Sequence, residues 1–387
     1  MVLRLLKKML RAADKFAAAI VMAWLSLVEL PAVLYERTPR LRQDLAQRPA
    51  AGDTYAIVVK YFGRQIDGNV EHLLRSLAAR GVNTVLVFNT PPGPGDIERI
   101  GPLVHRVLIR KNVGRDFGAY RAAYLRLLDD GVVPDRLLFF NDSTFYLPGP
   151  ALERMIDNLA TATTDVVGTF ENHARHHHIG SFAFSFSGTV FSHPAIQRFW
   201  RRYWPTGVRQ LVIERGEIGL SQTYKRSGFE IDVLHSLDKL ADRLGSLTLT
   251  EILELRPYVS RRPRFDPVRP MQKAAQLASL AATATTEAGA GLRDSLVRAE
   301  LIRQMIASVE NFSQVHTGFG LYHRLLDAPL VKRDLLRQGL FAEQDLTMIL
   351  VDVDPAMRQF IIRDLIGRQR PISLSLVENF MRRNGLR

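Results

Sequence analysis

The sequence predicts an α/β fold with a mostly parallel sheet, and three observations support that prediction. Runs rich in β-branched and aromatic residues recur between residues 55 and 234, and segments with helical periodicity separate most of them. Strands that alternate with helices in this way form parallel sheets with helices on both faces. Polar residues gather where the predicted strands end, which is where such sheets bind ligands.

The predicted elements begin at Tyr55. The strands are residues 55–62, 84–89, 104–109, 136–140, 165–169, 181–191 and 230–234, and the helices are residues 69–80, 119–128, 194–204 and 217–227. Residues 181–191, SFAFSFSGTVF, alternate at period two, so we expect an edge or second-layer strand there.

Two further regions flank this α/β domain, which we assign to residues 55–245. Residues 1–54 hold an apolar helix and a polar linker at 36–53. Residues 246–387 form a linker and a mainly helical C-terminal module, with a Pro/Arg-rich stretch at 261–270 and an Ala-rich one at 272–309.

Composition limits the class of partner. The 387 residues are 47% hydrophobic and 24% charged, as in ordinary globular proteins, and the absence of cysteine excludes disulfides and thiolate metal sites. The formal net charge of +13 favours an anionic partner: nucleic acid, a membrane surface or a phosphorylated substrate. The basic residues are spread along the chain and no nucleic-acid-binding motif is present, so we expect no nucleic acid.

The N-terminal region is basic and partly apolar. Residues 1–50 carry nine basic and four acidic residues, a net of +5. The uninterrupted apolar part, Phe16 to Leu25, is shorter than the roughly 20 residues of a spanning helix, and no clear signal-peptidase site follows it. We expect an amphipathic helix that lies either on an anionic membrane surface or on the protein's own body.

The most informative stretch is Lys111-Asn112-Val113-Gly114-Arg115-Asp116-Phe117-Gly118. It lies between the predicted strand at 104–109 and the predicted helix at 119–128. Glycine lets the backbone approach a ligand closely, and a helix N-terminus favours negative charge. The stretch therefore predicts a site for a phosphate-bearing ligand.

A second polar group, Asn141-Asp142-Ser143, follows the buried strand at 136–140. A carboxylate there can hold Mg²⁺ or Mn²⁺ against a diphosphate, or bind a sugar hydroxyl. The structural alternative is an Asx-type turn.

Three other groups are ambiguous. Adjacent histidines cannot all face one ion, so we expect a solvated loop there. We expect the aromatic residues Trp200, Tyr203 and Trp204 to pack in the core unless an exposed Trp stacks on a sugar. We expect the cations Lys332 and Arg333 to lie on a solvated face unless they meet phosphate or lipid. These groups are His173, His176, His177 and His178; Trp200, Tyr203 and Trp204; and Lys332 and Arg333.

Several motifs occur in a fixed order. They are Asn112-x-Gly114-Arg115-Asp116-x-Gly118-Ala119, Asn141-Asp142-Ser143, His178-x-x-Ser181-Phe182, Gly216-Glu217-x-x-Leu220-Ser221-Gln222 and Pro329 to Leu336. In this order they resemble the rhamnan synthesis protein F family over roughly residues 55 to 345. That family comprises glycosyltransferases of bacterial surface polysaccharide synthesis and is similar to nucleotide-sugar-dependent enzymes with one Rossmann-like domain, the GT-A type.

The resemblance implies a role for each motif. The donor nucleotide sugar would bind at Asn112, Gly114, Arg115, Asp116, Gly118, Asn141, Asp142 and Ser143, with His178 and Ser181 in the acceptor or sugar pocket. Asn141-Asp142-Ser143 stands where relatives carry the metal-binding Asp-x-Asp. Only Asp142 could then hold Mg²⁺ or Mn²⁺, and the alternative is metal-independent catalysis with a cation such as Arg115. Glu217 would be the catalytic base; Glu214, no base, or a helix-capping role for Glu217 are the alternatives.

The resemblance thus implies a glycosyltransferase that moves rhamnose or another deoxyhexose from a nucleotide sugar to a polysaccharide or lipid-linked glycan. Such an enzyme would be cytoplasmic and peripherally bound to the inner face of the bacterial membrane. The alternative is a non-catalytic glycan- or partner-binding protein that keeps the fold.

Overall fold

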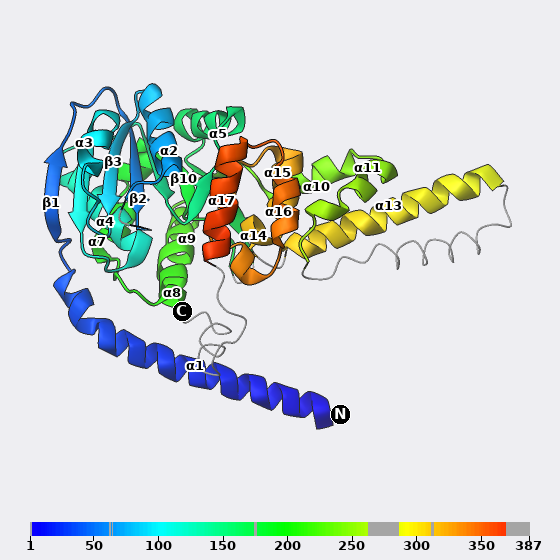
Figure 1. Cartoon of the computed structure of the whole chain (residues 1–387). Coiled ribbons are helices and arrows are strands. Elements are labelled where there is room, and N and C mark those ends of the chain that lie inside the picture. The colour runs from blue at the N-terminus through cyan, green and yellow to red at the C-terminus, as the bar shows by residue number, and fades with distance from the viewer. Residues whose placement is uncertain are drawn as a thin grey trace.

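The computed structural model describes residues 2–61, 63, 65–173, 176–261, 286–310 and 313–368 (Figure 1). The expected linker from 262 to 270, the first part of the Ala-rich segment and the last residues of the chain lie outside these ranges.

One mixed sheet organises the molecule, in the order β1-β4-β3-β2-β5-β10-β7-β11. Its strands are β1 (Leu41–Ala46), β2 (Thr54–Lys60), β3 (Asn83–Phe88), β4 (Arg106–Arg110), β5 (Arg136–Asn141), β7 (Val166–Gly168), β10 (Ala183–Ser187) and β11 (Ile231–Val233). Strands β4, β3, β2 and β5 are parallel, whereas β1 and β10 run antiparallel to their neighbours. The predicted α/β fold with a mostly parallel sheet is confirmed.

The chain order reverses between β2 and β5. From β2 the chain moves outward through β3 to β4 and then returns to β5 on the other side of β2. Such a switch point opens a crevice at the carboxyl ends of the strands, where α/β proteins bind ligands.

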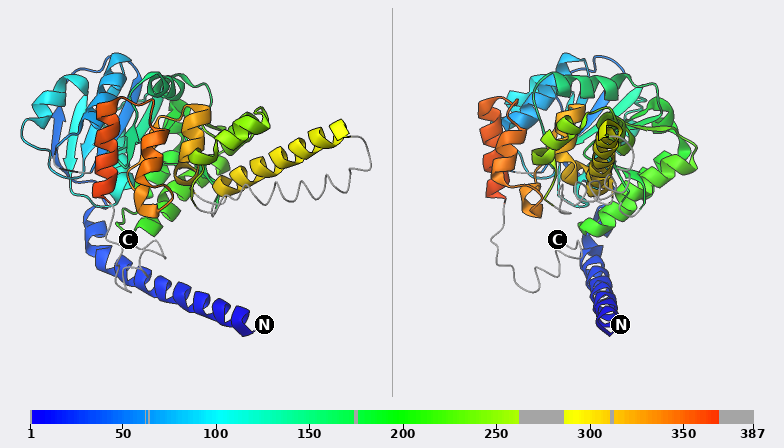
Figure 2. Two further views of the ribbon diagram at one scale, coloured as in Figure 1. Left: turned by 45° about the vertical axis from the view of Figure 1, so that its right-hand side comes forward. Right: turned by 90° about the vertical axis from the view of Figure 1, so that its right-hand side faces the viewer.

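Helices cover both faces of the sheet (Figure 2). Alternate residues of β2 point to opposite faces, so Ala56 and Val58 belong to one core and Tyr55, Ile57 and Val59 to the other. The first core includes α2 (Gly68–Ala79) and α5 (Pro150–Thr161). The second includes α4 (Arg115–Asp129), α7 (Pro194–Arg202) and α9 (Gly219–Arg226).

Two expectations were wrong in this domain. The segment 36–53 is not only a linker, because β1 within it pairs with β4. The segment 181–191 is neither an edge strand nor one strand: β10 lies between β5 and β7, and α6 (Gly188–Ser192) follows it. The helix begins there because the Ser187 side chain accepts a hydrogen bond from the Val190 amide.

Short elements complete the α/β region. They are α3 (Asp96–Ile100), η1 (Gly101–Leu103), β6 (Thr144–Tyr146), β8 (Glu171–Asn172), β9 (His178–Ile179), α8 (Arg209–Leu211), η2 (Val212–Ile218) and α10 (Leu237–Gly245). The later part is mainly helical, as predicted, with α11 (Leu249–Glu254), η3 (Arg256–Tyr258), α13 (Thr286–Glu310), α14 (Gln314–Thr317), α15 (Phe319–Leu326), η4 (Leu336–Gln338), α16 (Glu343–Ile349) and α17 (Pro355–Gly367).

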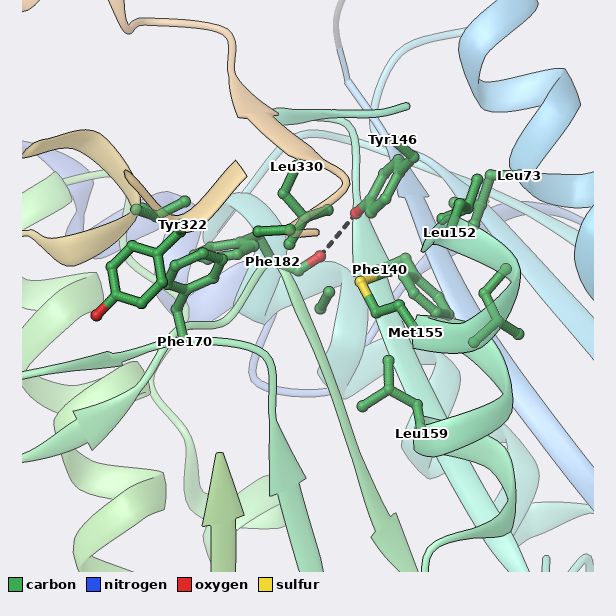
Figure 3. Packing of buried hydrophobic residues seen from close by; sticks show 14 of the residues in the cluster. Leu73, Phe140, Tyr146, Leu152, Met155, Leu159, Phe170, Phe182, Tyr322 and Leu330 are labelled. Atoms are coloured by element: carbon green, nitrogen blue, oxygen red, sulfur yellow. Dashed lines mark hydrogen bonds between the residues drawn. The ribbon is translucent and has the colours of Figure 1, made fainter. Parts of the chain in front are cut away.

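The C-terminal helices share a core with the sheet. Tyr322 and Leu330 pack in the same cluster as Phe140 and Phe182 of the α/β domain (Figure 3). The Tyr146 hydroxyl crosses this cluster to donate to the Phe182 carbonyl at 2.7 Å. Strand β12 (Leu330–Lys332) also pairs antiparallel with β6, directly after β5. The C-terminal module is therefore fixed at the carboxyl edge of the sheet.

Helix α1 (Val2–Tyr35) projects from the body (Figures 1 and 2). Its C-terminal end is anchored by Val33, which is buried, and by polar contacts described below. Large apolar side chains stand exposed along it: Phe16, Ile20, Trp24, Leu27, Val28, Leu34 and Tyr35. No helix in the described part of the chain combines the length and the apolar character needed to cross a membrane.

Candidate donor and acceptor site

A cavity of about 910 Å³ lies at the switch point, between the carboxyl ends of the strands and the C-terminal module. Ligand sites commonly have volumes of roughly 300–1,000 Å³. The predicted site residues that line the cavity are Asn112, Arg115, Asp116, Ser143, His178, Ser181 and Glu217. Gly114, Gly118, Asn141 and Asp142 are not among the residues that line it.

The stretch predicted to bind phosphate, residues 111–118, which we call the phosphate loop, is irregular up to Gly114 and helical from Arg115. Helix α4 begins at Arg115, four residues earlier than predicted, so Asp116 stands in its first turn. Arg115 has a φ of +51°, a left-handed conformation that costs free energy in any residue with a side chain. Such strain persists only where neighbouring contacts hold the backbone in place.

A buried cation supplies one of those contacts. Arg110, at the end of β4, donates to the Val113 carbonyl and to Asn89 Oδ1, both at 2.8 Å. Asn89 Nδ2 in turn donates to the Arg115 carbonyl at 3.2 Å. Glu36, just after α1, faces Arg110 at 3.5 Å. Burial lowers the pKa of Arg110, and Glu36 opposes that effect.

The loop at residues 205–207 holds the other side of the phosphate loop. Gly114 has a φ of +84°, and a Cβ there would lie 2.4 Å from Pro205 Cβ, so only glycine fits. Arg115 Nε donates to the Gly207 carbonyl at 2.7 Å. Glu29 of α1 accepts from Thr206 Oγ1 at 2.6 Å and from the Gly207 amide at 2.9 Å. Helix α1 is thus connected to Arg115 through this loop.

The residues after β5 point in different directions. Asp142 is 2% exposed, and its Oδ2 accepts from Lys60 Nζ and from the Tyr61 amide, both at 3.0 Å. Asn141 faces α4 instead, and its Nδ2 donates to Asp116 Oδ2 at 3.0 Å. Ser143 Oγ donates to Asn141 Oδ1, as in an Asx-type turn, and reaches the cavity.

Lys332 reaches this site from the C-terminal module, so the solvated face expected for Lys332 and Arg333 was wrong. The pairing of Lys332 with Thr144 places its side chain beside Ser143, and Nζ donates to Ser143 Oγ at 2.7 Å. Arg333 is 3% exposed, lies over the Phe145 ring and pairs with Asp67 at 2.8 Å. Sequence periodicity could not locate Lys332, because its position depends on a strand pair formed across almost 190 residues.

Asp116 is strongly perturbed. Burial, and then the negative charge of Asp142, raise the pKa of Asp116 to about 7, while Lys332 and Arg115 oppose the rise. At neutral pH Asp116 is therefore divided between its neutral and charged forms.

Glu217 lines the same cavity. Its Oε1 accepts from Ser181 Oγ at 2.6 Å, and its Oε2 is 3.5 Å from His178 Nε2. Burial alone would raise the pKa of Glu217, but the hydrogen bonds from His178 and Ser181 lower it. Burial alone would lower the pKa of His178, but Glu217 and the His176 carbonyl raise it. The pair favours a charged imidazolium and a carboxylate.

The local helix geometry around Glu217 is unusual. Glu217 belongs to η2, a π-helical stretch between α8 and α9, so it does not cap the first turn of a helix. Such π-helical turns are rare and occur frequently at functional sites. A Cβ on Gly216 would lie 2.8 Å from the Phe117 ring, so glycine allows η2 to approach the start of α4. Glu214, the alternative base, is exposed and does not line the cavity.

The histidines do not form a solvated loop throughout. His178, in β9, is 3% exposed. His173 and His177 instead lie against Glu171 at 3.3 and 2.8 Å, and the ligand atoms of these three residues lie within 4.8 Å of one another. Within the described residues this is the only group of three such side chains with metal-site spacing.

The aromatic group divides between core and surface. Trp200 is fully buried, as predicted, whereas Trp204 is 43% exposed. Trp204 lies in a shallow second cavity of about 670 Å³ that four arginines also line: Arg198, Arg202, Arg215 and Arg226. We call Trp204 and these arginines the basic patch.

Comparison with known proteins bears on the same region. The sequence model of the family described as rhamnan synthesis protein F matches residues 85–253. This confirms the resemblance, over a shorter range than residues 55 to 345. The chain is also 28% identical over 217 residues to uncharacterized protein y4gN of Sinorhizobium fredii, a stretch that covers 55% of each chain.

A further relative is virulence protein VirA of Vibrio anguillarum, which is 30% identical over 135 residues, or 34% of this chain and 42% of that protein. The chain thus spans about half the length of the relatives it matches.

Two solved structures are similar to a limited degree. The glycosyltransferase GlyE of Streptococcus pneumoniae has a TM-score of 0.29 at 12% identity, covering 46% of this chain and 45% of its own. The mannosyltransferase PcManGT of Pyrobaculum calidifontis, in complex with GDP-Man and Mn²⁺, has a TM-score of 0.28 at 11% identity, covering 92% of this chain and 96% of its own.

Proposed function

We propose that this chain, which matches the rhamnan synthesis protein F family over residues 85–253, is a GT-A-type glycosyltransferase. It would move a sugar, with rhamnose or another deoxyhexose the first to be tested, from a nucleotide donor to a polysaccharide or lipid-linked glycan. The observation that carries the proposal is one cavity that is lined both by the start of α4, with Arg115, and by a carboxylate, Glu217.

The donor side rests on the start of α4. The first amide groups of a helix attract anions, and Arg115 and Arg209 line the same cavity. Asn112, Arg115, Asp116 and Ser143 would contact the donor, while Gly114, Gly118, Asn141 and Asp142 would shape the wall behind it. Donor binding is therefore to be measured with and without a divalent metal ion, Mg²⁺ or Mn²⁺.

The acceptor side rests on Glu217. Sugar transfer requires a base that removes the proton of the acceptor hydroxyl as that oxygen attacks the anomeric carbon. Glu217 is ionised in this environment, and Ser181 and His178 hold it toward the cavity. His178 and Ser181 would then also contact the acceptor or the sugar.

The membrane-facing side rests on α1 and the basic patch. The exposed apolar side chains of α1 stand at positions 16, 20, 24, 27, 28, 34 and 35, a spacing that places them along one face of the helix. Trp204 of the basic patch stands two residues before Thr206, which bonds Glu29 of α1. Apolar and cationic groups together suit an anionic lipid surface, so we infer peripheral binding to the cytoplasmic face of the membrane.

The test is a donor panel. Purified protein is mixed with UDP-, GDP- and dTDP-sugars, with and without Mn²⁺, and donor binding and hydrolysis are measured. Glu217→Gln should reduce turnover at least about 100-fold and leave donor affinity within about two-fold, because only proton removal is lost. Glu214→Gln is the matched control and should keep the wild-type rate.

The incomplete Asp-x-Asp and the pairing of Asp142 with Lys60 keep a second candidate open: a glycan-binding protein without activity. Binding of glycans without any donor binding would support that candidate and refute the enzyme.

A further inference from the structure

The lone carboxylate after β5 does not fit a metal site. Asp142 does not line the cavity, and its Oδ2 already accepts two hydrogen bonds, from Lys60 Nζ and from the Tyr61 amide. A divalent ion bound to this oxygen would displace Lys60, whose buried ammonium group would then repel the ion at close range. The surroundings of Asp142 therefore suit an ammonium group and not a divalent ion.

A cation of the chain itself, Lys332, lies beside Ser143, the last position of the segment that stands where relatives carry Asp-x-Asp. Lys332 lines the cavity, with Nζ 2.7 Å from Ser143 Oγ and 4.6 Å from the centre of the Phe182 ring. Burial lowers the pKa of Lys332, and the carboxylates of Asp334, Asp116 and Glu217 oppose that effect. Its charge acts on both walls of the cavity.

The two departures from Asp-x-Asp are consistent with a lysine rather than a metal ion. Lys332 Nζ donates to Ser143 Oγ, Ser143 Oγ donates to Asn141 Oδ1, and Asn141 Nδ2 donates to Asp116 Oδ2. Every link uses a hydroxyl or an amide that can both donate and accept. A carboxylate at position 141 would repel Asp116, whereas asparagine binds it.

We propose that Lys332 binds and neutralises the donor diphosphate, in place of a divalent metal ion. The inference rests on the proposed function. In the transfer, the acceptor oxygen bonds to the anomeric carbon, its proton passes to Glu217, and the bond from that carbon to the diphosphate breaks. The electron pair stays on the diphosphate oxygen, where the ammonium group of Lys332 compensates the charge together with Arg115 and Arg209.

Isothermal titration of the full chain tests the proposal with UDP, GDP and dTDP as probes, in EDTA and then with Mg²⁺ or Mn²⁺. We expect one nucleotide to bind in EDTA and its affinity to change less than about three-fold with metal. Lys332→Gln should weaken binding in EDTA at least about ten-fold, and Lys332→Arg should restore most of it, since both effects follow from the charge. The matched control is Lys239→Gln, which removes an exposed lysine of α10 that does not line the cavity. This variant should bind nucleotide as the wild type does.

Each other outcome is decisive. Nucleotide binding that requires metal overturns this proposal and leaves the glycosyltransferase standing. Loss of that metal-dependent binding in His177→Ala would assign the metal to Glu171, His173 and His177. Equal binding by Lys332→Gln and wild type in EDTA also overturns it. No binding of any nucleotide or nucleotide sugar under any condition overturns the proposed function itself. The comparison of wild-type nucleotide binding in EDTA and with metal needs no substitution, so it tests the proposal even if Lys332→Gln fails to fold.

Discussion

Asp116 links the electrostatics of the site to the stability of the protein. Its ordinary pKa is 3.8, and burial followed by the charge of Asp142 raise it to about 7 in the folded state. Between about pH 4 and pH 7 the folded protein holds a proton that the unfolded chain releases, so this group's contribution to stability falls as pH rises through that window.

Asp116→Asn removes the titration and keeps a side chain that can accept from Asn141. The free energy of unfolding of the variant should rise by about 2 kcal/mol relative to wild type between pH 4 and pH 7.5, since each unit of pKa shift is worth about 1.4 kcal/mol before relaxation. Urea denaturation at several pH values measures the difference. A difference that does not depend on pH would mean that Asp116 titrates normally.

At the scale of single residues, the sequence predicted several side chains that line the cavity, but not which side chains they bond to. Asn112, Arg115, Asp116, Ser143 and Glu217 line the cavity because strand ends and helix starts meet there. The sequence could not indicate that Asp142 turns toward Lys60, because two adjacent positions at a strand end can face either way. The roles of the cavity-lining residues toward donor and acceptor stay predictions.

At the scale of elements, α1 is linked to the donor wall through one carboxylate. Glu29 accepts from Thr206 and Gly207, and Gly207 accepts from Arg115. Glu29→Ala should weaken nucleotide binding about three- to ten-fold, since two hydrogen bonds to a charged group are lost and the loop that holds Arg115 loosens.

Ser26→Ala is the control for that change. Ser26 lies one turn earlier on α1, and its hydroxyl donates to the Met22 carbonyl of the same helix at 2.8 Å. Titration calorimetry on both variants separates the effect of the link from a general loss of helix stability. Equal affinities for Glu29→Ala and wild type would show that α1 and Arg115 are not coupled.

Strand prediction succeeded where the hydrophobic pattern and the propensity of the residues for strands agreed. Strands β2, β3, β4 and β5 begin and end within two residues of their predicted bounds. It failed for β1, a polar strand that forms only because β4 offers it an edge. Helix prediction placed the start of α4 too late, because glycine and polar residues in a first turn resemble a loop.

At the scale of the whole molecule, α1 presents a surface that the body does not cover. Val28→Asp should lower binding to vesicles of anionic lipid at least about ten-fold, because it places a charge on the apolar face and repels the lipid. Sedimentation with vesicles, at low and high salt and with neutral lipid, measures this.

Val133→Asp is the matched control, since Val133 is 62% exposed and Val28 58% exposed. Val133 lies between α4 and β5, away from α1, so its variant should bind vesicles as the wild type does. If both variants bind equally well, α1 does not dock on lipid.

The pairing of β12 with β6 has a consequence for how the protein matures. The sheet strands and Glu217 precede β12 in the chain, so they leave the ribosome before Lys332 does. Under the proposed role of Lys332, nucleotide binding requires residues 330–332 to be paired with β6, so a ligand added during refolding would report that pairing rather than the formation of the sheet alone.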